Sequence, residues 1–197
     1  MWRRRSLDED RRHDIVIRMK YVALLRGINV GGNSLIKMDA LKAAFEKTGH
    51  TNVRTLIASG NVIFDSDEKN QEKLAKTLEE AVMKTFNVSS RVLVLSEKEM
   101  KTVLAEIPAS WKKVNDLRMY VCFIFPTMKP KDAAHEVPVK DGIDVVDVGK
   151  NVLYLSTKMQ GITKSGLSKM VGTKMYKEMT MRNFNTTKRI VEMMEKN

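Results

Sequence analysis

The order in which strand-like and helix-like segments follow one another is the feature that most constrains the fold of this chain. Between residues 19 and 95, short apolar runs alternate with stretches whose apolar residues recur every three or four positions. The strand-like runs are 21–26, 53–58, 62–64 and 91–95, and the helical patterns are 38–48 and 71–86. This order is the split β-α-β arrangement of ferredoxin-like folds. We therefore predict, for residues 19–96, a ferredoxin-like domain with a four-stranded antiparallel sheet and two helices on one face.

The remaining chain predicts a second α+β unit. A helix over 96–106 is followed by a strand at 119–125, a loop with three prolines and a hairpin of 144–148 with 152–155. Helical patterns then cover 164–175 and 184–194. We expect residues 97–197 to form a second ferredoxin-like domain with basic C-terminal helices. Residues 1–18, charged and poor in apolar residues, are expected to be a disordered tail that leaves Met1 and Met19 both open as the natural start.

Composition excludes several kinds of protein. The apolar runs are far shorter than the roughly 20 residues that span a bilayer, so we expect a cytoplasmic protein without membrane contact. A single cysteine and three scattered histidines predict neither a metal site nor a bound cofactor. The formal net charge is +11, and residues 150–189 hold nine lysines and arginines against one glutamate. Such a segment suits a nucleic acid or another polyanion, or serves only as a solvated surface. The oligomeric state is left open.

A polar glycine loop follows the first predicted strand. It contains Arg26, Gly27, Asn29, Gly31 and Gly32. Backbone N–H groups beside a guanidinium form a typical anion-binding arrangement, although the glycines alone are explained by a tight turn. An arginine at the end of an apolar strand needs a carboxylate, a cluster of carbonyls or a bound anion, and the sequence does not choose among them.

Two further segments extend this candidate site. In the split topology the hairpin Ser59, Gly60 and Asn61 lies at the same edge of the sheet as the end of the first strand, so it is predicted to face the glycine loop. Near the C-terminus, a helix start with polar residues is a second candidate anion site as well as a set of possible helix caps. Its residues are Arg182, Asn183, Asn185 and Thr186.

Three motifs, in order, resemble a bacterial family known as domain of unknown function 1697. They are RGINVGGN at 26–33, RTLIASGNVIF at 54–64 and MTMRNFNTTKRI at 179–190. The resemblance implies two ferredoxin-like halves and a soluble cytoplasmic protein, and it implies no assigned activity. Phe184 stands where the family more often has Trp, which keeps a packing aromatic.

Two functions of different class follow from these observations. The first is a binding protein for a phosphate-bearing small molecule, a nucleotide or a nucleic acid, held by the glycine loop and the basic C-terminal segment. The second is an enzyme, a hydrolase or transferase, that acts on a phosphorylated or acyl substrate at a cleft of Arg26, Asn29 and Asn61. No usual general base stands out in the sequence, which favours binding.

Overall fold

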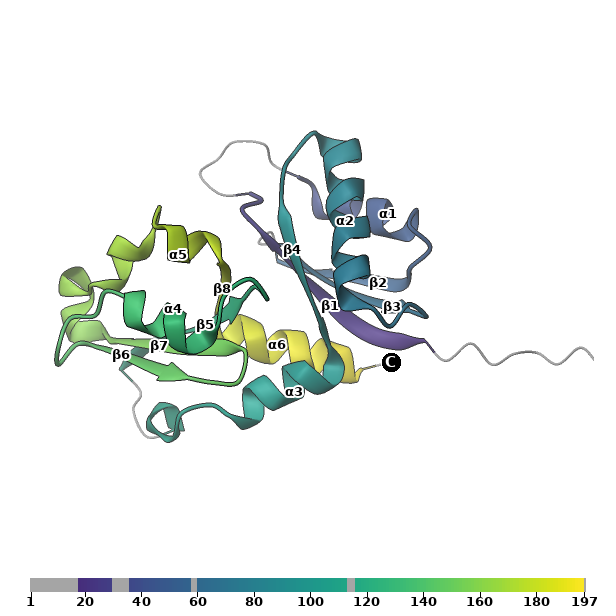
Figure 1. The fold of residues 1–197 in the computed structure, drawn as a ribbon. Coiled ribbons are helices and arrows are strands. Elements are labelled where there is room, and N and C mark those ends of the chain that lie inside the picture. The colour runs from purple at the N-terminus through teal and green to yellow at the C-terminus, as the bar shows by residue number, and fades with distance from the viewer. Residues whose placement is uncertain (1–17, 30–35, 58–59, 113–115, 197) are drawn as a thin grey trace, which may run out of the picture.

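A computed structural model describes residues 18–29, 36–57, 60–112 and 116–196, and it contains two four-stranded antiparallel sheets (Figure 1). The first sheet has the order β2-β3-β1-β4. Its strands are β1 (Met19–Arg26), β2 (Thr51–Leu56), β3 (Asn61–Ser66) and β4 (Arg91–Ser96). Every pairing in it is antiparallel. This confirms the predicted split β-α-β sheet of the first half.

Two helices cover the outer face of the first sheet: α1 (Met38–Glu46) and α2 (Gln71–Phe86) (Figure 1). Helix α2 starts where the side chain of Asn70 accepts a hydrogen bond from the Lys73 N–H, and it ends at Asn87, whose backbone is left-handed. Their apolar stripes, with Leu41 and Leu78 among the fully buried residues, pack on one face of the sheet. An outer core thus lies between these helices and the sheet.

The second sheet repeats the first, in the order β6-β7-β5-β8. Its strands are β5 (Leu117–Ile124), β6 (Asp144–Val148), β7 (Val152–Lys158) and β8 (Met179–Asn183). Two short helices, α4 (Pro130–Glu136) and α5 (Lys174–Lys177), pack on its outer face around a second outer core. Both halves therefore have the ferredoxin-like strand order that was predicted.

Two local predictions in the second half are wrong, and one strand was missed. The loop with prolines contains α4, because Pro130 occupies the first turn of a helix, where its missing N–H costs nothing. The helix expected over 164–175 is replaced by two 3-10 turns, at Met159–Lys164 and Leu167–Met170, and by α5. The glycines in this stretch interrupt a longer helix. The edge strand β8, over Met179–Asn183, was not predicted, whereas Asn183 at its end caps α6 as the sequence indicated.

Two more helices lie between the sheets: α3 (Glu97–Ala105) after β4 and α6 (Phe184–Glu195) after β8 (Figure 1). Helix α3 begins with a capping box, since Ser96 and Glu99 bond each other's backbone N–H groups. Helix α6 contacts β1 and β3 of one sheet and β5 and β8 of the other. One central core therefore joins the halves.

The central core takes residues from both sheets and from both of these helices. Trp111 packs edge-on against Tyr154 and Phe184, with ring centroids 5.6 and 5.0 Å away. Phe184 thus keeps the packing role expected of an aromatic residue at this position. The proposed division of the chain at residue 96 falls between β4 and α3 and stays a prediction. The proposed tail lies outside the described residues, apart from Arg18.

Candidate functional site

Arg26, at the end of β1, points its guanidinium at the second half of the molecule. Its Nε donates to the carbonyl of Met179 at 3.0 Å and its Nη2 to the carbonyl of Tyr176 at 3.2 Å. The guanidinium also lies 5.2 Å from the centre of the Tyr176 ring. The sequence left a carboxylate, a cluster of carbonyls or a bound anion as possible partners of Arg26, and the hydrogen bonds in the structure go to carbonyls. Within the described ranges, Arg26 has no salt bridge and its Nη1 has no hydrogen-bond partner.

The glycine loop is described only at its two ends, and Gly31 and Gly32 lie outside the described residues. Gly27 is exposed and has a φ of +78°, with nothing within 4 Å of a Cβ placed on it. Asn29 has a φ of 56°. Its side-chain amide donates to the Ile36 carbonyl, and its Oδ1 accepts from the Ile36 N–H at 2.7 Å. Asn29 therefore closes the base of the loop.

The hairpin between β2 and β3 lies beside the end of β1, as the topology predicted. The Leu25 N–H donates to the Gly60 carbonyl at 2.8 Å. Gly60 has a φ of +74°, and a Cβ there would lie 2.8 to 2.9 Å from side-chain atoms of Ile28 and Leu25, so this position requires glycine. Asn61 is fully buried and donates to the Leu56 carbonyl. Ser59 lies outside the described residues.

Arg182, on β8, is buried and satisfied inside the protein. Its exposed fraction is 6%, and each of the five N–H groups of its guanidinium has an acceptor. None of these acceptors is a carboxylate, and burial lowers the pKa of Arg182 to about 10. The acceptors are Asn61 Oδ1, Thr180 Oγ1 and the carbonyls of Leu25, Gly60 and Met181.

Three of those acceptors belong to the first half, so Arg182 and Asn61 join the second sheet to the first. The sequence analysis named both residues as candidate ligand contacts, and the structure shows both of them in hydrogen bonds inside the protein. A buried guanidinium with every donor in use has no hydrogen bond left for an external anion. Their observed role is to fasten β8 to the hairpin of the first half.

Asn183 caps the start of α6. The side chain of Asn183 accepts a hydrogen bond from the Asn185 N–H at 2.9 Å. Asn185 is exposed and Thr186 is partly exposed, next to the exposed Lys188. Capping explains Asn183 without a ligand, and the roles proposed for Asn185 and Thr186 stay predictions.

Arg91 and Glu178 were missed by the sequence analysis. Arg91 pairs with Arg26 in the register of β1 and β4. Its Nη1 donates to the Glu178 carboxylate at 3.0 Å and to the Lys177 carbonyl at 2.9 Å, and its guanidinium lies 3.9 Å from the Phe125 ring centre. The predicted topology already made β1 and β4 neighbours, which was the available signal.

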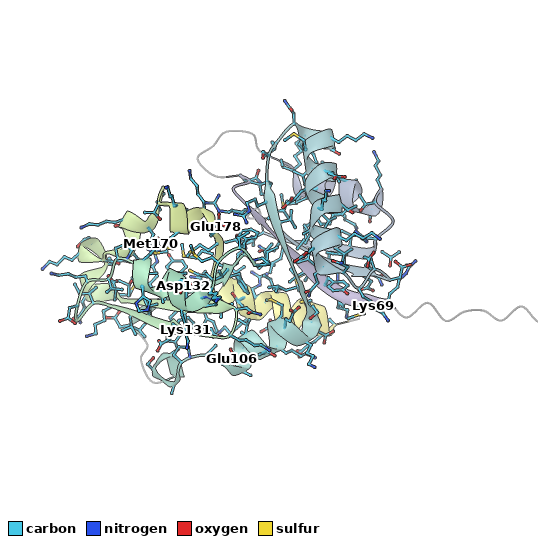
Figure 2. All side chains as sticks on the ribbon, in the orientation of Figure 1. Lys69, Glu106, Lys131, Asp132, Met170 and Glu178 are labelled. Atoms are coloured by element: carbon cyan, nitrogen blue, oxygen red, sulfur yellow. The ribbon has the colours of Figure 1, made fainter. Side chains whose placement is uncertain are left out.

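Glu178, labelled in Figure 2, lies just after α5 where the second half meets the first. The Thr127 hydroxyl, and then the Arg91 guanidinium, hold the pKa of its carboxyl below the ordinary value against the opposite effect of burial. We use the name junction cluster for the four cations Arg26, Arg91, Lys174 and Lys177 together with this one carboxylate. Both lysines are exposed on α5.

A separate cleft of about 710 Å³ opens between the two halves. Helices α2 and α3 and strand β4 form one side, and the end of β5, the start of α4 and the turn between β6 and β7 form the other. We call it the inter-half cleft. Its apolar lining includes Val94, Val103, Phe123, Phe125 and Val152, and Lys98, Lys129 and Lys150 stand at its rim. Of the site candidates named from the sequence, those within the described ranges do not line it.

The described residues contain neither a metal-binding cluster nor a membrane-spanning helix. They contain no cluster of three or more His, Cys, Asp or Glu residues placed to hold a metal ion. None of the helices in the described ranges is long and apolar enough to cross a membrane. The lone cysteine, Cys122, is buried in β5, and burial raises its pKa, which keeps the thiol protonated.

Comparison with known proteins gives one shared fold and one family match. The two-half fold is shared with a conserved bacterial protein, SP0830, from Streptococcus pneumoniae, with a TM-score of 0.79 and 24% sequence identity over 91% of this chain and all of that one. The family model described as "Protein of unknown function (DUF1697)" matches residues 19–154, and the chain belongs to this family. Among curated proteins, no match was found.

Proposed function

We propose that this protein binds a phosphate-bearing anion at the junction cluster, with Arg26 as the main contact. The observation that carries the proposal is the state of the Arg26 guanidinium. Two of its nitrogens are fixed by carbonyls, the Glu178 carboxylate interacts with it through space without a hydrogen bond or salt bridge, and Nη1 has no partner among the described residues. A positioned guanidinium of this kind loses little conformational entropy when it binds a phosphate oxygen.

The surroundings of Arg26 support the same ligand chemistry. Lys174 and Lys177 are exposed on α5, the same short helix that carries Tyr176, on whose ring the Arg26 guanidinium lies. Glu178, the carboxylate of the cluster, is bonded to Arg91 and Thr127 instead of to Arg26. The exposed Gly27 adds a backbone N–H with no side chain to obstruct an approaching ligand.

The ligand class proposed is a nucleotide or another small phosphate compound, with nucleic acid as the polymeric form of the same chemistry. The basic residues of 150–189 are spread over the turn between β6 and β7, the 3-10 turns, α5 and α6, and so give a longer ligand additional contacts. The enzyme hypothesis has less support, because Asn61 is buried and Asn29 closes its own loop. Neither residue is placed with Arg26 around a shared substrate.

The test is calorimetric titration of inorganic phosphate, ATP and a single-stranded oligonucleotide into the wild-type protein and Arg26→Gln. Glutamine keeps a side-chain amide donor for one of the two carbonyls, so the variant removes the charge with the least damage to the fold. We expect affinity for the phosphate compounds to fall by roughly tenfold or more, which corresponds to the loss of a charge-assisted hydrogen bond of about 1.5–3 kcal/mol.

The matched control is Lys164→Gln, which removes an exposed positive charge from the same basic segment at a site away from the cluster. It should change affinity much less than Arg26→Gln. Melting curves of both variants without ligand distinguish lost binding from lost folding. Equal binding by Arg26→Gln and wild type, or binding by neither, contradicts the proposal.

A further inference from the structure

The strand β4 is the edge of the first sheet and borders the inter-half cleft. The hydrogen bond from the Leu25 N–H to Gly60 fixes which residues of β1 face β3. By the alternation of an antiparallel ladder, Leu93 and Leu95 bond to β1. The backbone groups of Val92, Val94 and Ser96 therefore point out of the sheet, toward the cleft.

Two of the three outward N–H groups are occupied by carboxylates. The Val92 N–H donates to Glu79 at 2.7 Å, and the Ser96 N–H donates to Glu99 at 2.8 Å. Between them, the N–H and the carbonyl of Val94 have no partner anywhere in the described ranges. Val94 lines the cleft, so a ligand that enters it can bond both the donor and the acceptor at this position of the open strand edge.

A donor and an acceptor on one residue of an open strand edge are matched by one residue of an extended peptide. The cleft has room for a short one, since its volume of about 710 Å³ lies within the range of roughly 300–1,000 Å³ that small ligands occupy. A strand added beside β4 would present alternate side chains toward the second half. There, Phe123, Phe125 and Val152 offer an apolar surface.

Charges at the rim define the peptide further. The ammonium groups of Lys98, Lys129 and Lys150 have no ion pair among the described residues, whereas the carboxylate of Glu99 is taken by the backbone of Ser96 and by Gln71. Glu106, labelled in Figure 2 at the end of α3, accepts from the Lys150 N–H. The lining also carries the exposed carboxylate of Glu72, on the α2 side of the cleft. An acidic group on the ligand would meet the unpaired lysines at the rim.

We propose that the inter-half cleft binds a short extended peptide, with apolar residues at alternate positions and an acidic residue, as an additional strand on β4. This peptide site is distinct from the anion site proposed at the junction cluster, although Phe125 of its lining stacks with Arg91 of that cluster. The contact that defines it is the pair of backbone hydrogen bonds at Val94.

The test uses the wild-type chain and a fluorescein-labelled hexapeptide, Val-Thr-Val-Thr-Val-Asp, measured by fluorescence anisotropy. Its controls are the same peptide with N-methyl groups on the two central residues and a version with Lys in place of Asp. We expect N-methylation to abolish binding and the charge reversal to weaken it at least fivefold. Binding that is insensitive to N-methylation, or no binding of the unmodified peptide at millimolar concentration, overturns the proposal.

Amide hydrogen exchange of the same wild-type protein locates the contact. In the free protein the Val94 N–H should exchange much faster than those of Leu93 and Leu95, which bond to β1. Addition of the hexapeptide should slow exchange at Val94 by at least tenfold and leave Leu93 unchanged. Protection at other residues with none at Val94, or a protein that dimerises through β4 with the same protection before peptide is added, overturns the peptide assignment.

Discussion

The strands β4 and β8 occupy the same position in the two halves of this protein, but their open edges are treated differently. On β8 the outward carbonyls of Met179 and Met181 accept guanidinium N–H groups, from Arg26 and Arg182 respectively. On β4 the outward N–H groups at both ends are bonded to glutamates, and the middle residue faces the inter-half cleft. The outward carbonyls of β8 thus bond to guanidinium groups, and the outward N–H groups at the ends of β4 bond to carboxylates.

This comparison separates the structural arginines from the candidate binding groups. An open edge invites pairing with another chain, and native proteins protect it with charges or cover it. The first half covers the open edge of β8, and Arg182 on β8 bonds to the Leu25 and Gly60 carbonyls of that half. Strand β4 is protected only in part. An interpretation that treats every arginine near a glycine loop as a phosphate contact therefore fails for Arg182 and survives for Arg26.

The largest expected change in the free energy of unfolding comes from loss of the Arg182 hydrogen bonds that hold β8 to the first half. Replacement of Arg182 by methionine fills similar space but leaves buried acceptors, among them Asn61 Oδ1 and the Leu25 carbonyl, without donors. Each stranded acceptor costs about 1–3 kcal/mol, so we expect the free energy of unfolding to fall by at least about 3 kcal/mol. Urea denaturation measures it.

The control for this variant is Arg189→Met, the same substitution at an exposed position on α6. Its free energy of unfolding should stay within about 0.5 kcal/mol of wild type. If Arg182→Met loses less than about 1 kcal/mol, the buried hydrogen bonds do not hold β8 to the first half, and the contrast between the edges is lost.

A smaller effect is expected at the protected end of β4. Replacement of Glu79 by alanine removes the acceptor of the buried Val92 N–H. The expected loss in free energy of unfolding is about 1–2 kcal/mol. Glu80→Ala, an exposed neighbour on the same helix, should change it by no more than about 0.5 kcal/mol. Equal effects of the two substitutions would show that Glu79 does not protect the edge.

The smallest expected effect is the pH dependence that Glu178 contributes. Its folded-state pKa is lowered from 4.5, so the carboxylate stabilises the fold above that pH, and the contribution disappears as pH falls through the folded-state pKa. Because the pair with Arg91 is partly exposed, we expect less than about 1 kcal/mol. Thermal unfolding of wild type and Glu178→Gln between pH 7 and about pH 2.5 should show their difference shrinking toward acid. If the stability difference between wild type and Glu178→Gln does not change with pH, ionisation of Glu178 does not contribute to the stability of the fold.

The fold of each half was accessible from the sequence to different degrees. In the first half, apolar periodicity was strong and the strands, helices and hairpin followed it. In the second, α4 and β8 were missed, because short elements carry little periodicity and are stabilised mainly by what they pack against. Residues Met179–Asn183 form a strand because β5 pairs with them on one side and arginines satisfy their carbonyls on the other.

By itself, the sequence determined the ferredoxin-like order, the capping box of α3, the glycine at Gly60 and the position of Arg26 at the end of β1. These features depend on local periodicity and on backbone conformation, which neighbouring residues specify. Tertiary structure alone decided that Arg182 is buried while Arg26 keeps donors available, and that β4 lines a cleft. Those outcomes depend on contacts between residues more than a hundred positions apart, for which a single sequence carries no periodic signal.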